Sequence, residues 1–422
     1  MEDILIRGKR LLSGRVRVSG SKNASLPLLA ACLLASGTSR LRNIPDLRDI
    51  RTMREMLALL GASSTYQDGV LEVDSRGFAC RPAPYDLVRT MRASIYVLAP
   101  LLARFGLARV ALPGGCAIGL RPIDQHLKGL EAMGAVVKTE HGDIRAEAPD
   151  GLHGASLYMD VPSVGATVNI LLAAALAQGR TEIEHAACEP EIAHLAECLN
   201  HMGARIEGAG TSRLTVTGVE RLEPADICVI PDRIEAGTLA LAGAITDGDV
   251  VIEAFPRGHL AALERKCNEA GIQFRDEGAP DVVRVVRSRN APRPTDVVTL
   301  PHPGFPTDLQ AQWMALMCRA EGRAVVTETI WENRFMHVAE LNRMGADIHI
   351  EGNSALIRGG APLTGAPVMA SDLRASAALI LAGLVAEGET RISRVYHLDR
   401  GYERMEEKLS RLGAEIRRVP AG

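Results

Sequence analysis

The 422-residue chain is poor in aromatic side chains, since Phe, Tyr and Trp together make up only 3% of it. A core of this size must therefore be packed mainly from Leu, Ala, Val and Ile. The 40 glycines, by contrast, are numerous. The chain is 47% hydrophobic and 23% charged, which is typical of a globular protein and excludes a disordered one. At about 150 residues per domain, its length predicts two or three domains.

Long hydrophobic runs are also missing. The longest apolar stretches, residues 164–177 and 375–386, are shorter than the roughly 18 residues that suggest a membrane span. The first ten residues, MEDILIRGKR, carry two acids and no signal-peptide core. We therefore expect no membrane insertion and a cytoplasmic location.

The charge balance lacks an excess of either sign. Lys and Arg number 48 against 51 Asp and Glu, a formal net charge of −3. A nucleic-acid-binding or membrane-surface protein usually carries a basic excess, so neither class of partner is expected. Protein partners cannot be inferred from the sequence.

The eight cysteines lack metal-site or disulfide spacing. None forms a CxxC pair or a Cys/His ligand pattern, so we expect no metal, no disulfide framework and a reducing compartment. Cys32, Cys188, Cys198 and Cys318 fall in segments predicted to be helical. Buried cysteines are usually inert.

Two glycine markers repeat along the chain. One glycine ends a small apolar segment six times, 66 to 74 residues apart, at Gly37, Gly106, Gly179, Gly248, Gly322 and Gly388. A second, in words such as LGA and MGA, recurs in phase at Gly61, Gly134, Gly203, Gly271, Gly345 and Gly413. The second marker is typical of a helix C-cap followed by a strand. Chance recurrence of common Gly-Ala words is the alternative, but six matches of both markers in register argue against it.

Each repeat predicts two helices and several strands. The first helix is apolar on nearly all sides and should be buried, and alternating segments such as 214–216 and 348–350 predict strands. The simplest interpretation is an α/β fold of six βαβαββ units, three in each of two domains.

Charged or hydroxyl residues recur near the start of each apolar segment, at Lys22, Arg92, Ser163, Arg233, Asp308 and Arg374. A helix N-terminus attracts anions, and helices that start at one face would converge on a single cleft. Plain N-capping explains Ser and Asp equally well at any one position. Cations there oppose the helix dipole, which indicates a phosphorylated or carboxylated small-molecule ligand. Arg334 and Arg400 add further candidates for recognising such groups.

Cys116 differs from the other cysteines because it lies in a glycine-rich loop, PGGCAIGLRP, five residues before Arg121. Nearby cations favour the thiolate, so this residue is a candidate acid or nucleophile. The same spacing is compatible with a non-catalytic cysteine.

Taken together, these segments resemble the UDP-N-acetylglucosamine 1-carboxyvinyltransferases, the enolpyruvyl transferases that open peptidoglycan precursor synthesis for the cell wall. The matching stretches include SGSKNA (19–24), LPGGCAIGLRPIDQH (112–126), PSVGAT (162–167), PDRIEAGT (231–238), PGFPTDLQAQ (303–312), ENRFMH (332–337) and DLRASAAL (372–379). The combination is specific and spans the chain. The resemblance implies two domains, residues 22–231, carrying the Cys116 loop, and residues 1–21 plus 232–422. It also implies an active site in the cleft between them.

The resemblance implies transfer of the enolpyruvyl group of phosphoenolpyruvate to the 3′-hydroxyl of UDP-N-acetylglucosamine by addition–elimination, with release of phosphate and without a cofactor. It assigns proton transfer at the sugar hydroxyl to Asp308. Cys116 becomes the proton donor, which can form a phosphoenolpyruvate adduct and is the target of fosfomycin. Lys22 and Arg400 complete the catalytic set.

Binding roles follow from the same resemblance. The phosphoenolpyruvate ligands would be Lys22, Asn23, Arg121, Arg334, Arg374 and Arg400, with Arg334 and Arg374 at the carboxylate. The UDP-sugar ligands would be Arg92, Arg121, Pro122, Ile123, Asp124, Gln125, Ser163, Val164, Gly165, Asp308 and Ile330. Val161 departs from members that have a Lys there, and Trp331 replaces a Phe.

Three rival functions are weighed against this one. The shikimate-pathway enolpyruvyl transferase shares the fold, but its GSKS and GNAGTA motifs are absent. A paralogue acting on another nucleotide sugar is compatible with Val161 and Trp331. A non-catalytic nucleotide-sugar binder would not need Cys116, Asp308 and Lys22 together.

Overall fold

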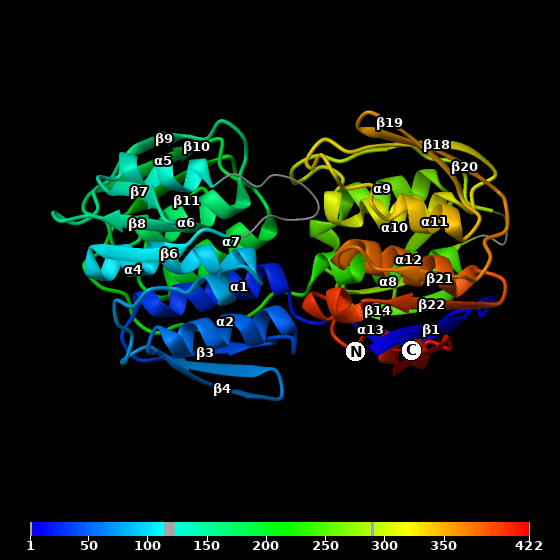
Figure 1. The fold of residues 1–422 in the computed structure, drawn as a ribbon, viewed down its shortest axis with the longest axis horizontal. Helices are drawn as coiled ribbons and strands as arrows, with labels where there is room; N and C mark the ends of the chain where they lie inside the picture. The colour runs from blue at the N-terminus through cyan, green and yellow to red at the C-terminus, as the bar shows by residue number, and fades with distance from the viewer. Residues whose placement is uncertain (1, 114–122, 288–290, 422) are drawn as a thin grey trace. The chain divides into compact units, whose positions relative to one another are not determined.

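The structure, a computed structural model, describes residues 2–113, 123–287 and 291–421. They form two compact units (Figure 1). We call residues 20–113 and 123–230 the inserted domain, and residues 2–19 and 231–421 the host domain. Each has its own hydrophobic core.

The inserted domain contains three units of the predicted kind. The first has α1 (Lys22–Ala31), the short 3-10 helix η1 (Cys32–Leu34), β3 (Thr38–Arg42), α2 (Arg48–Leu59), β4 (Ser63–Gln67) and β5 (Val70–Asp74). The second has α3 (Tyr85–Val88), η2 (Arg92–Val97), α4 (Leu98–Phe105), β6 (Leu107–Ala111), α5 (Asp124–Ala132), β7 (Val136–Glu140) and β8 (Asp143–Glu147). The third has β9 (Ser156–Tyr158), α6 (Val164–Ala174), β10 (Arg180–Glu184), α7 (Pro190–His201), β11 (Arg205–Glu207) and β12 (Arg213–Thr217). The last strand, β13 (Asp226–Cys228), pairs in parallel with β3 and so completes the first sheet.

The host domain repeats the plan. Its first unit has β2 (Ser13–Arg17), α8 (Arg233–Ile245), β14 (Asp249–Glu253), η3 (Arg257–His259), α9 (Ala261–Glu269), β15 (Ile272–Asp276) and β16 (Val282–Arg287). Its second has β17 (Val297–Val298), η4 (Thr307–Leu309), α10 (Gln310–Met317), β18 (Gly322–Thr327), α11 (Val338–Arg343), β19 (Asp347–Glu351) and β20 (Ser354–Gly359). Its third has β21 (Pro367–Met369), α12 (Leu373–Val385), β22 (Glu389–Ser393), η5 (Val395–Arg400), α13 (Met405–Arg411) and β23 (Glu415–Pro420).

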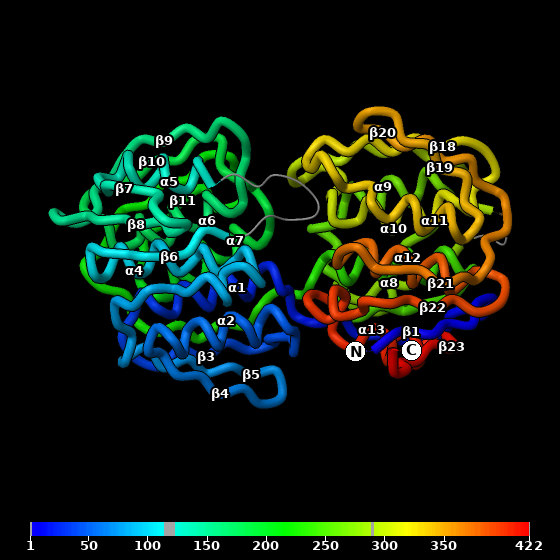
Figure 2. Tube along the Cα trace, viewed as in Figure 1, coloured from blue at the N-terminus to red at the C-terminus, as the bar shows by residue number. Residues whose placement is uncertain are grey.

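In each domain at least one sheet contains strands that are far apart in the sequence. In the host domain β1 (Glu2–Arg7) lies between β22 and β23, so the sheet order is β21-β22-β1-β23. Glu2 pairs with Pro420, and the blue N-terminal segment therefore runs beside the red C-terminal one (Figure 2). The predicted fold class, two similar α/β domains of three βαβαββ units each, is confirmed.

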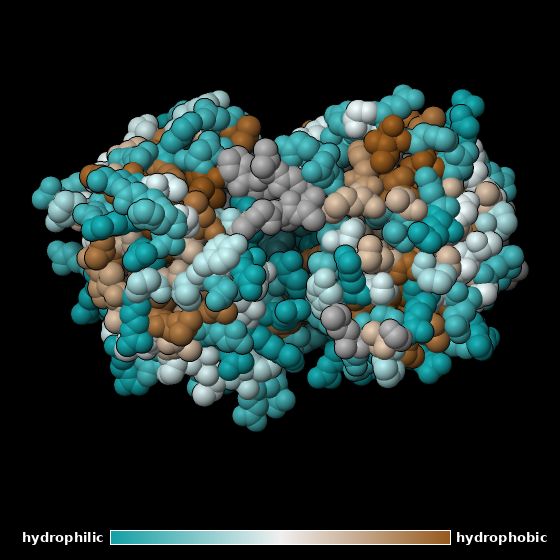
Figure 3. Space-filling view, viewed as in Figure 1, coloured by the Kyte–Doolittle hydropathy of each residue, from teal (hydrophilic) through white to brown (hydrophobic). Residues whose placement is uncertain are grey.

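The sequence pattern explains which faces are buried. The apolar helices α1, α6, α8, α10 and α12 are buried on nearly all sides, and in α8 all thirteen residues are buried. Strands such as β8 and β12 alternate buried and exposed residues, because one face of each sheet covers helices and the other meets solvent. Hydrophilic residues accordingly cover most of the face drawn in Figure 3, with hydrophobic ones in small groups.

The predicted C-cap role of the second glycine marker is confirmed at all six positions. Each of these glycines follows a helix and has φ between +89° and +105°, a left-handed conformation that glycine adopts without the strain of a Cβ atom.

Two helix predictions need correction. The apolar helix expected from Arg92 onward is divided into η2 and α4, because Pro100 has no N–H to donate to the carbonyl of Tyr96 and its ring crowds that oxygen. Cys188 lies in the loop before α7, whose first residue is Pro190, and not in a helix. No helix among the described residues is long and apolar enough to cross a membrane.

Candidate functional site

An ion triad lies where buried helices of the host domain begin. Asp308 is the second residue of η4, which directly precedes α10, and Arg374 is the second residue of α12. The Asp308 carboxylate accepts hydrogen bonds from Nη2 of Arg334 at 2.6 Å and Nη2 of Arg374 at 3.1 Å. The arginine side chains are 5% and 7% exposed, whereas that of Asp308 is 26% exposed. Three residues predicted to bind substrate are therefore in direct contact.

The electrostatics of the triad keep Asp308 ionised. Burial acts to raise the pKa of its carboxyl group, but the charges of Arg374 and Arg334 outweigh burial and hold this pKa well below its usual range. In this arrangement Asp308 is a weak base.

Other side chains hold the triad in place. The guanidinium carbon of Arg374 lies 5.4 Å from the ring centroid of Tyr402, a cation–π contact. The Tyr402 hydroxyl is in turn hydrogen-bonded to Thr238 of α8 at 3.0 Å and to Gln312 of α10 at 3.0 Å. The beginnings of α8, α10 and α12 are thus linked, as predicted for helices that start at one face. Sequence reasoning missed Tyr402, although it lies two residues after Arg400.

N-capping, the alternative explanation for these polar residues, holds at some positions only. Of the predicted residues, Ser163 caps α6. The helices α8 and α12 are capped by Asp232 and Asp372, which are neighbours of predicted residues. Asp308 does not cap α10, whose N-cap residue is Leu309. Its carboxylate is engaged by arginines instead.

In the inserted domain Lys22 is partly neutralised by the protein itself. Lys22 is the first residue of α1, and its Nζ lies 3.4 Å from Oδ2 of Asp49 on α2. Both side chains are nearly buried, at 11% and 5% exposed. An external anion therefore does not have to offset the whole charge of Lys22, because Asp49 offsets part of it. Asp49 was not singled out from the sequence.

A neutral histidine supports the start of α6. His126 Nδ1 lies 2.7 Å from the amide nitrogen of Asn169, which also donates to the carbonyl of Ile95. Burial and the charge of Arg92 lower the pKa of His126 to about 4. A Cβ atom at Gly165 would lie 2.9 Å from His126 Nε2, so glycine is needed for the imidazole to pack there. The Ser163–Gly165 turn thus rests on an uncharged ring.

The remaining predicted residues are distributed as follows. Asn23 lies on α1 and Arg92 begins η2. Ile123, Asp124 and Gln125 lie at the start of α5, Val164 begins α6, Ile330 lies in a loop after β18, and Arg400 ends η5. Cys116, Arg121 and Pro122 lie outside the described residues. Val161 is exposed.

Cys32 and Cys318 are buried, as predicted for core cysteines, and burial raises the pKa of each thiol to about 12.

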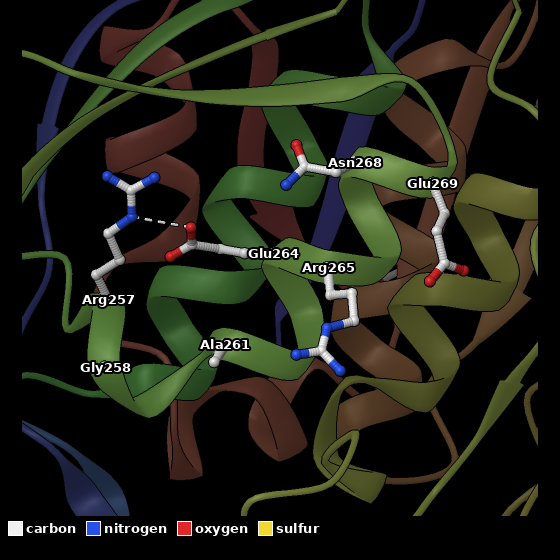
Figure 4. Close-up of a pocket in the computed structure, with 7 residues that line it drawn as sticks. All are labelled: Arg257, Gly258, Ala261, Glu264, Arg265, Asn268 and Glu269. Atoms are coloured by element: carbon white, nitrogen blue, oxygen red, sulfur yellow. Dashed lines mark hydrogen bonds and ion pairs between the residues drawn. The ribbon is translucent and has the colours of Figure 1, made fainter.

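The described surface contains a depression away from these residues. It has a volume of about 580 Å³ and is lined by Arg257, Gly258, Ala261, Glu264, Arg265, Asn268 and Glu269 (Figure 4). Arg257 donates to Glu264 at 2.9 Å within it. None of these residues was predicted to act in the site. Within the described ranges no group of three His, Cys, Asp or Glu side chains is arranged to hold a metal ion.

Comparison with known proteins gives concordant results. Residues 6–409 match the family model described as EPSP synthase (3-phosphoshikimate 1-carboxyvinyltransferase). The chain is 57% identical over 419 residues to a UDP-N-acetylglucosamine 1-carboxyvinyltransferase of Desulfosudis oleivorans, covering 99% of this chain and 100% of that one. It is 53% identical to UDP-N-acetylglucosamine 1-carboxyvinyltransferase 1 of Staphylococcus aureus, with 99% and 100% covered.

Solved structures agree with the fold. The enolpyruvyl transferase NikO from Streptomyces tendae superposes with a TM-score of 0.89 at 28% identity, over 100% of this chain and 99% of that one. EPSP synthase from Acinetobacter baumannii superposes with a TM-score of 0.78 at 20% identity, with 100% of both chains covered.

Proposed function

The chain belongs to the EPSP synthase family of enolpyruvyl transferases, and we propose that it transfers the enolpyruvyl group of phosphoenolpyruvate to the 3′-hydroxyl of UDP-N-acetylglucosamine. Full-length relatives named for this activity are 53–57% identical to it, against 28% for NikO. These identities favour this substrate over another nucleotide sugar. Since both substrates are metabolites of the cytoplasm, we propose that compartment as well.

The observation that carries the proposal is the ion triad. Two nearly buried guanidinium groups, on Arg334 and Arg374, face one carboxylate. Paired arginines of this kind suit a substrate carboxylate, and we assign that of phosphoenolpyruvate to them. We assign its phosphate to Lys22, Arg121 and Arg400.

We assign the sugar nucleotide to residues at helix starts of the inserted domain. The Ser163–Gly165 turn begins α6. The first N–H groups of a helix have no partner within the helix and suit a diphosphate. Arg92 lies close enough to His126 to lower the pKa of that ring, and so belongs to the same region. Asn23 and residues 121–125 complete the assignment, with Asp308 and Ile330 on the host domain.

The proposed reaction begins with addition. The 3′-hydroxyl gives its proton to Asp308, and its oxygen forms a bond to C2 of phosphoenolpyruvate. The electron pair of the C2–C3 double bond takes a proton at C3 from an acid that we assign to Cys116. The intermediate then loses a proton from C3 and expels phosphate, which leaves the enol ether. Fixed cations around phosphate and carboxylate supply the electrostatic stabilisation that usually dominates such catalysis.

A phosphate-release assay tests the proposal. We expect phosphate only when both substrates are present, in equal amount to an enolpyruvyl sugar nucleotide identified by mass. Replacing the sugar nucleotide with shikimate 3-phosphate should give none. The assignment would be refuted if phosphate were released with shikimate 3-phosphate. It would also be refuted if no phosphate were released with UDP-N-acetylglucosamine.

A further inference from the structure

Asp308 occupies the place that the proposed function gives to a substrate group. The carboxylate of Asp308 is the anion held by Arg334 and Arg374, at 2.6 and 3.1 Å. A carboxylate of phosphoenolpyruvate would need these same two guanidinium groups. The proposed base and the proposed substrate therefore have the same binding partners.

The arginines are not fully engaged by Asp308. Nη1 of Arg334 is buried and has no hydrogen-bond partner among the described residues. A buried guanidinium N–H without an acceptor is destabilising, so this position is suited to an incoming oxygen. Asp308 is also the most solvent-exposed member of the triad.

Arg374, in contrast, is fixed independently of Asp308. Its guanidinium group packs over Tyr402, which is hydrogen-bonded to two neighbouring helices, and its backbone N–H donates to the capping carboxylate of Asp372 at 2.8 Å. Removal of Asp308 from the triad would therefore leave the arginine in place to hold another anion.

We propose that Asp308 is an internal counter-ion whose position on Arg334 and Arg374 is taken by the substrate carboxylate, so that Asp308 is released to act as base only after phosphoenolpyruvate has bound. This inference rests on the proposed function and adds an order of events to it. Before the exchange, the two arginines hold the carboxylate of Asp308. After it, they hold the substrate carboxylate, and Asp308 lies beside that group without its two ion pairs.

The exchange has a chemical consequence at the sugar hydroxyl. A second carboxylate nearby disfavours the ionised form of Asp308 and raises its pKa, which makes it a better proton acceptor. The sugar hydroxyl is thus activated only when the atom that its oxygen must attack, C2 of phosphoenolpyruvate, is already present.

The test measures binding of 2-phospholactate, an unreactive analogue that keeps carboxylate and phosphate, beside ethyl phosphate, which lacks the carboxylate. Titration calorimetry on wild type, Asp308→Asn and Asp308→Ala would give the affinities. We expect both variants to bind phospholactate about tenfold tighter than wild type, because the internal competitor for two charge-assisted hydrogen bonds is gone. Ethyl phosphate should bind all three proteins equally.

Asp347→Asn is the matched control. Asp347 is a half-exposed carboxylate of the same domain that contacts Arg358 and His349, and its loss should change neither affinity. Equal or weaker phospholactate binding by both Asp308 variants would overturn the inference. An equal gain in affinity for ethyl phosphate would also overturn it, because removing a negative charge would then favour any anion and not the carboxylate in particular.

The proposed function can fail separately. If wild type released no phosphate from the two substrates, the reaction would be wrong, whereas a carboxylate-specific gain in the Asp308 variants would still establish the exchange. Thermal unfolding of each variant, measured before titration, confirms that the folded protein is being compared.

Discussion

The two domains share one plan but treat charge differently where their buried helices begin. In the host domain, Arg334 and Arg374 surround Asp308 in a nearly buried triad. In the inserted domain, the start of α6 is capped by the hydroxyl of Ser163 and rests on a histidine whose pKa is lowered to about 4 by burial and by the charge of Arg92. The host triad thus pairs two cations with one carboxylate, whereas the ring under α6 is neutral and lies near a cation.

The difference follows from the energetics of burial. A buried cation must be paired, because an unpaired charge in a low-dielectric surrounding is strongly destabilising. Host-domain arginines therefore need a counter-ion when no substrate is bound. Backbone N–H groups at a helix N-terminus carry only partial charge, so the start of α6 needs no counter-ion. The inserted domain resembles the host domain at Lys22, where a nearly buried cation is also paired with a carboxylate, that of Asp49.

The largest expected effect is that of Asp308→Asn on turnover. We expect a loss of about 10²–10⁴-fold, because an amide cannot accept the hydroxyl proton, while sugar-nucleotide binding is retained. Steady-state phosphate release and calorimetry would measure the two quantities, with Asp347→Asn as control. Near-normal turnover would remove Asp308 from the role of base.

The next effect is on stability. Arg374→Ala leaves Asp308 with one cation and should lower the free energy of unfolding by roughly 3–5 kcal/mol. Urea unfolding would measure it, and adding Asp308→Asn should restore part of the loss. The control Arg358→Ala removes a half-exposed partner of Asp347 at 3.8 Å and should cost about 0–1 kcal/mol. If the double variant Arg374→Ala with Asp308→Asn were no more stable than Arg374→Ala alone, the loss of stability would not come from leaving the Asp308 charge with one cation.

Much of this organisation could be predicted from the sequence. Six in-phase glycines gave the number of units because the left-handed C-cap conformation restricts residue choice, and φ is positive at all six. The division of the helix at Pro100 was missed because the repeat suggested continuity. The insertion of β1 between β22 and β23 could not be predicted, since strand pairing across the whole chain leaves no local signal.

The site could be predicted only in part. Matching motifs pointed to Asp308, Arg334 and Arg374, but their mutual contact depends on tertiary packing of segments up to 66 residues apart. The partners Asp49, His126 and Tyr402 escaped notice because a buried polar residue has no local pattern until its neighbours are known. The roles of all the site residues remain predictions, and Cys116, Arg121 and Pro122 also lie outside the described residues.

Lys22→Ala probes the place where the two domains resemble each other. We expect the KM for phosphoenolpyruvate to rise about tenfold or more, since a charge-assisted contact to phosphate is lost, with little change in sugar-nucleotide affinity. Steady-state kinetics and calorimetry would separate the two. Because Asp49 is then buried without its lysine, Lys22→Met with Asp49→Asn is the control for stability: it should recover stability but not the KM. Equal loss for both substrates would indicate that Lys22 shapes the whole site.

Gly165→Ala tests the packing of the neutral His126 ring against the start of α6. The new Cβ would lie 2.9 Å from His126 Nε2 and 3.0 Å from Cε1, and overpacking of this kind typically costs about 1–3 kcal/mol. We expect sugar-nucleotide affinity to fall about tenfold, with partial recovery on adding His126→Ser, which makes room. Gly258→Ala, where nothing lies within 4 Å of the new atom, is the control. If Gly165→Ala left the sugar-nucleotide affinity unchanged, the Ser163–Gly165 turn would not bind the diphosphate.

The smallest expected effect is the pH dependence of the triad. The pKa of Asp308 is lowered in the folded protein by Arg374 and Arg334 against the opposing effect of burial, so its contribution to stability is fully present above the unfolded value of about 3.9 and is lost as the pH falls through the lower folded value. The difference in unfolding free energy between wild type and Asp308→Asn should therefore be constant from pH 7 to about 5 and should narrow only below about pH 4. Urea unfolding of both proteins across this range would measure it, and the difference cancels the titration of exposed carboxylates common to both. A difference that already changes between pH 7 and 5 would mean that the arginines do not hold Asp308 ionised, and the contrast between the charged host triad and the neutral ring under α6 would fail with it.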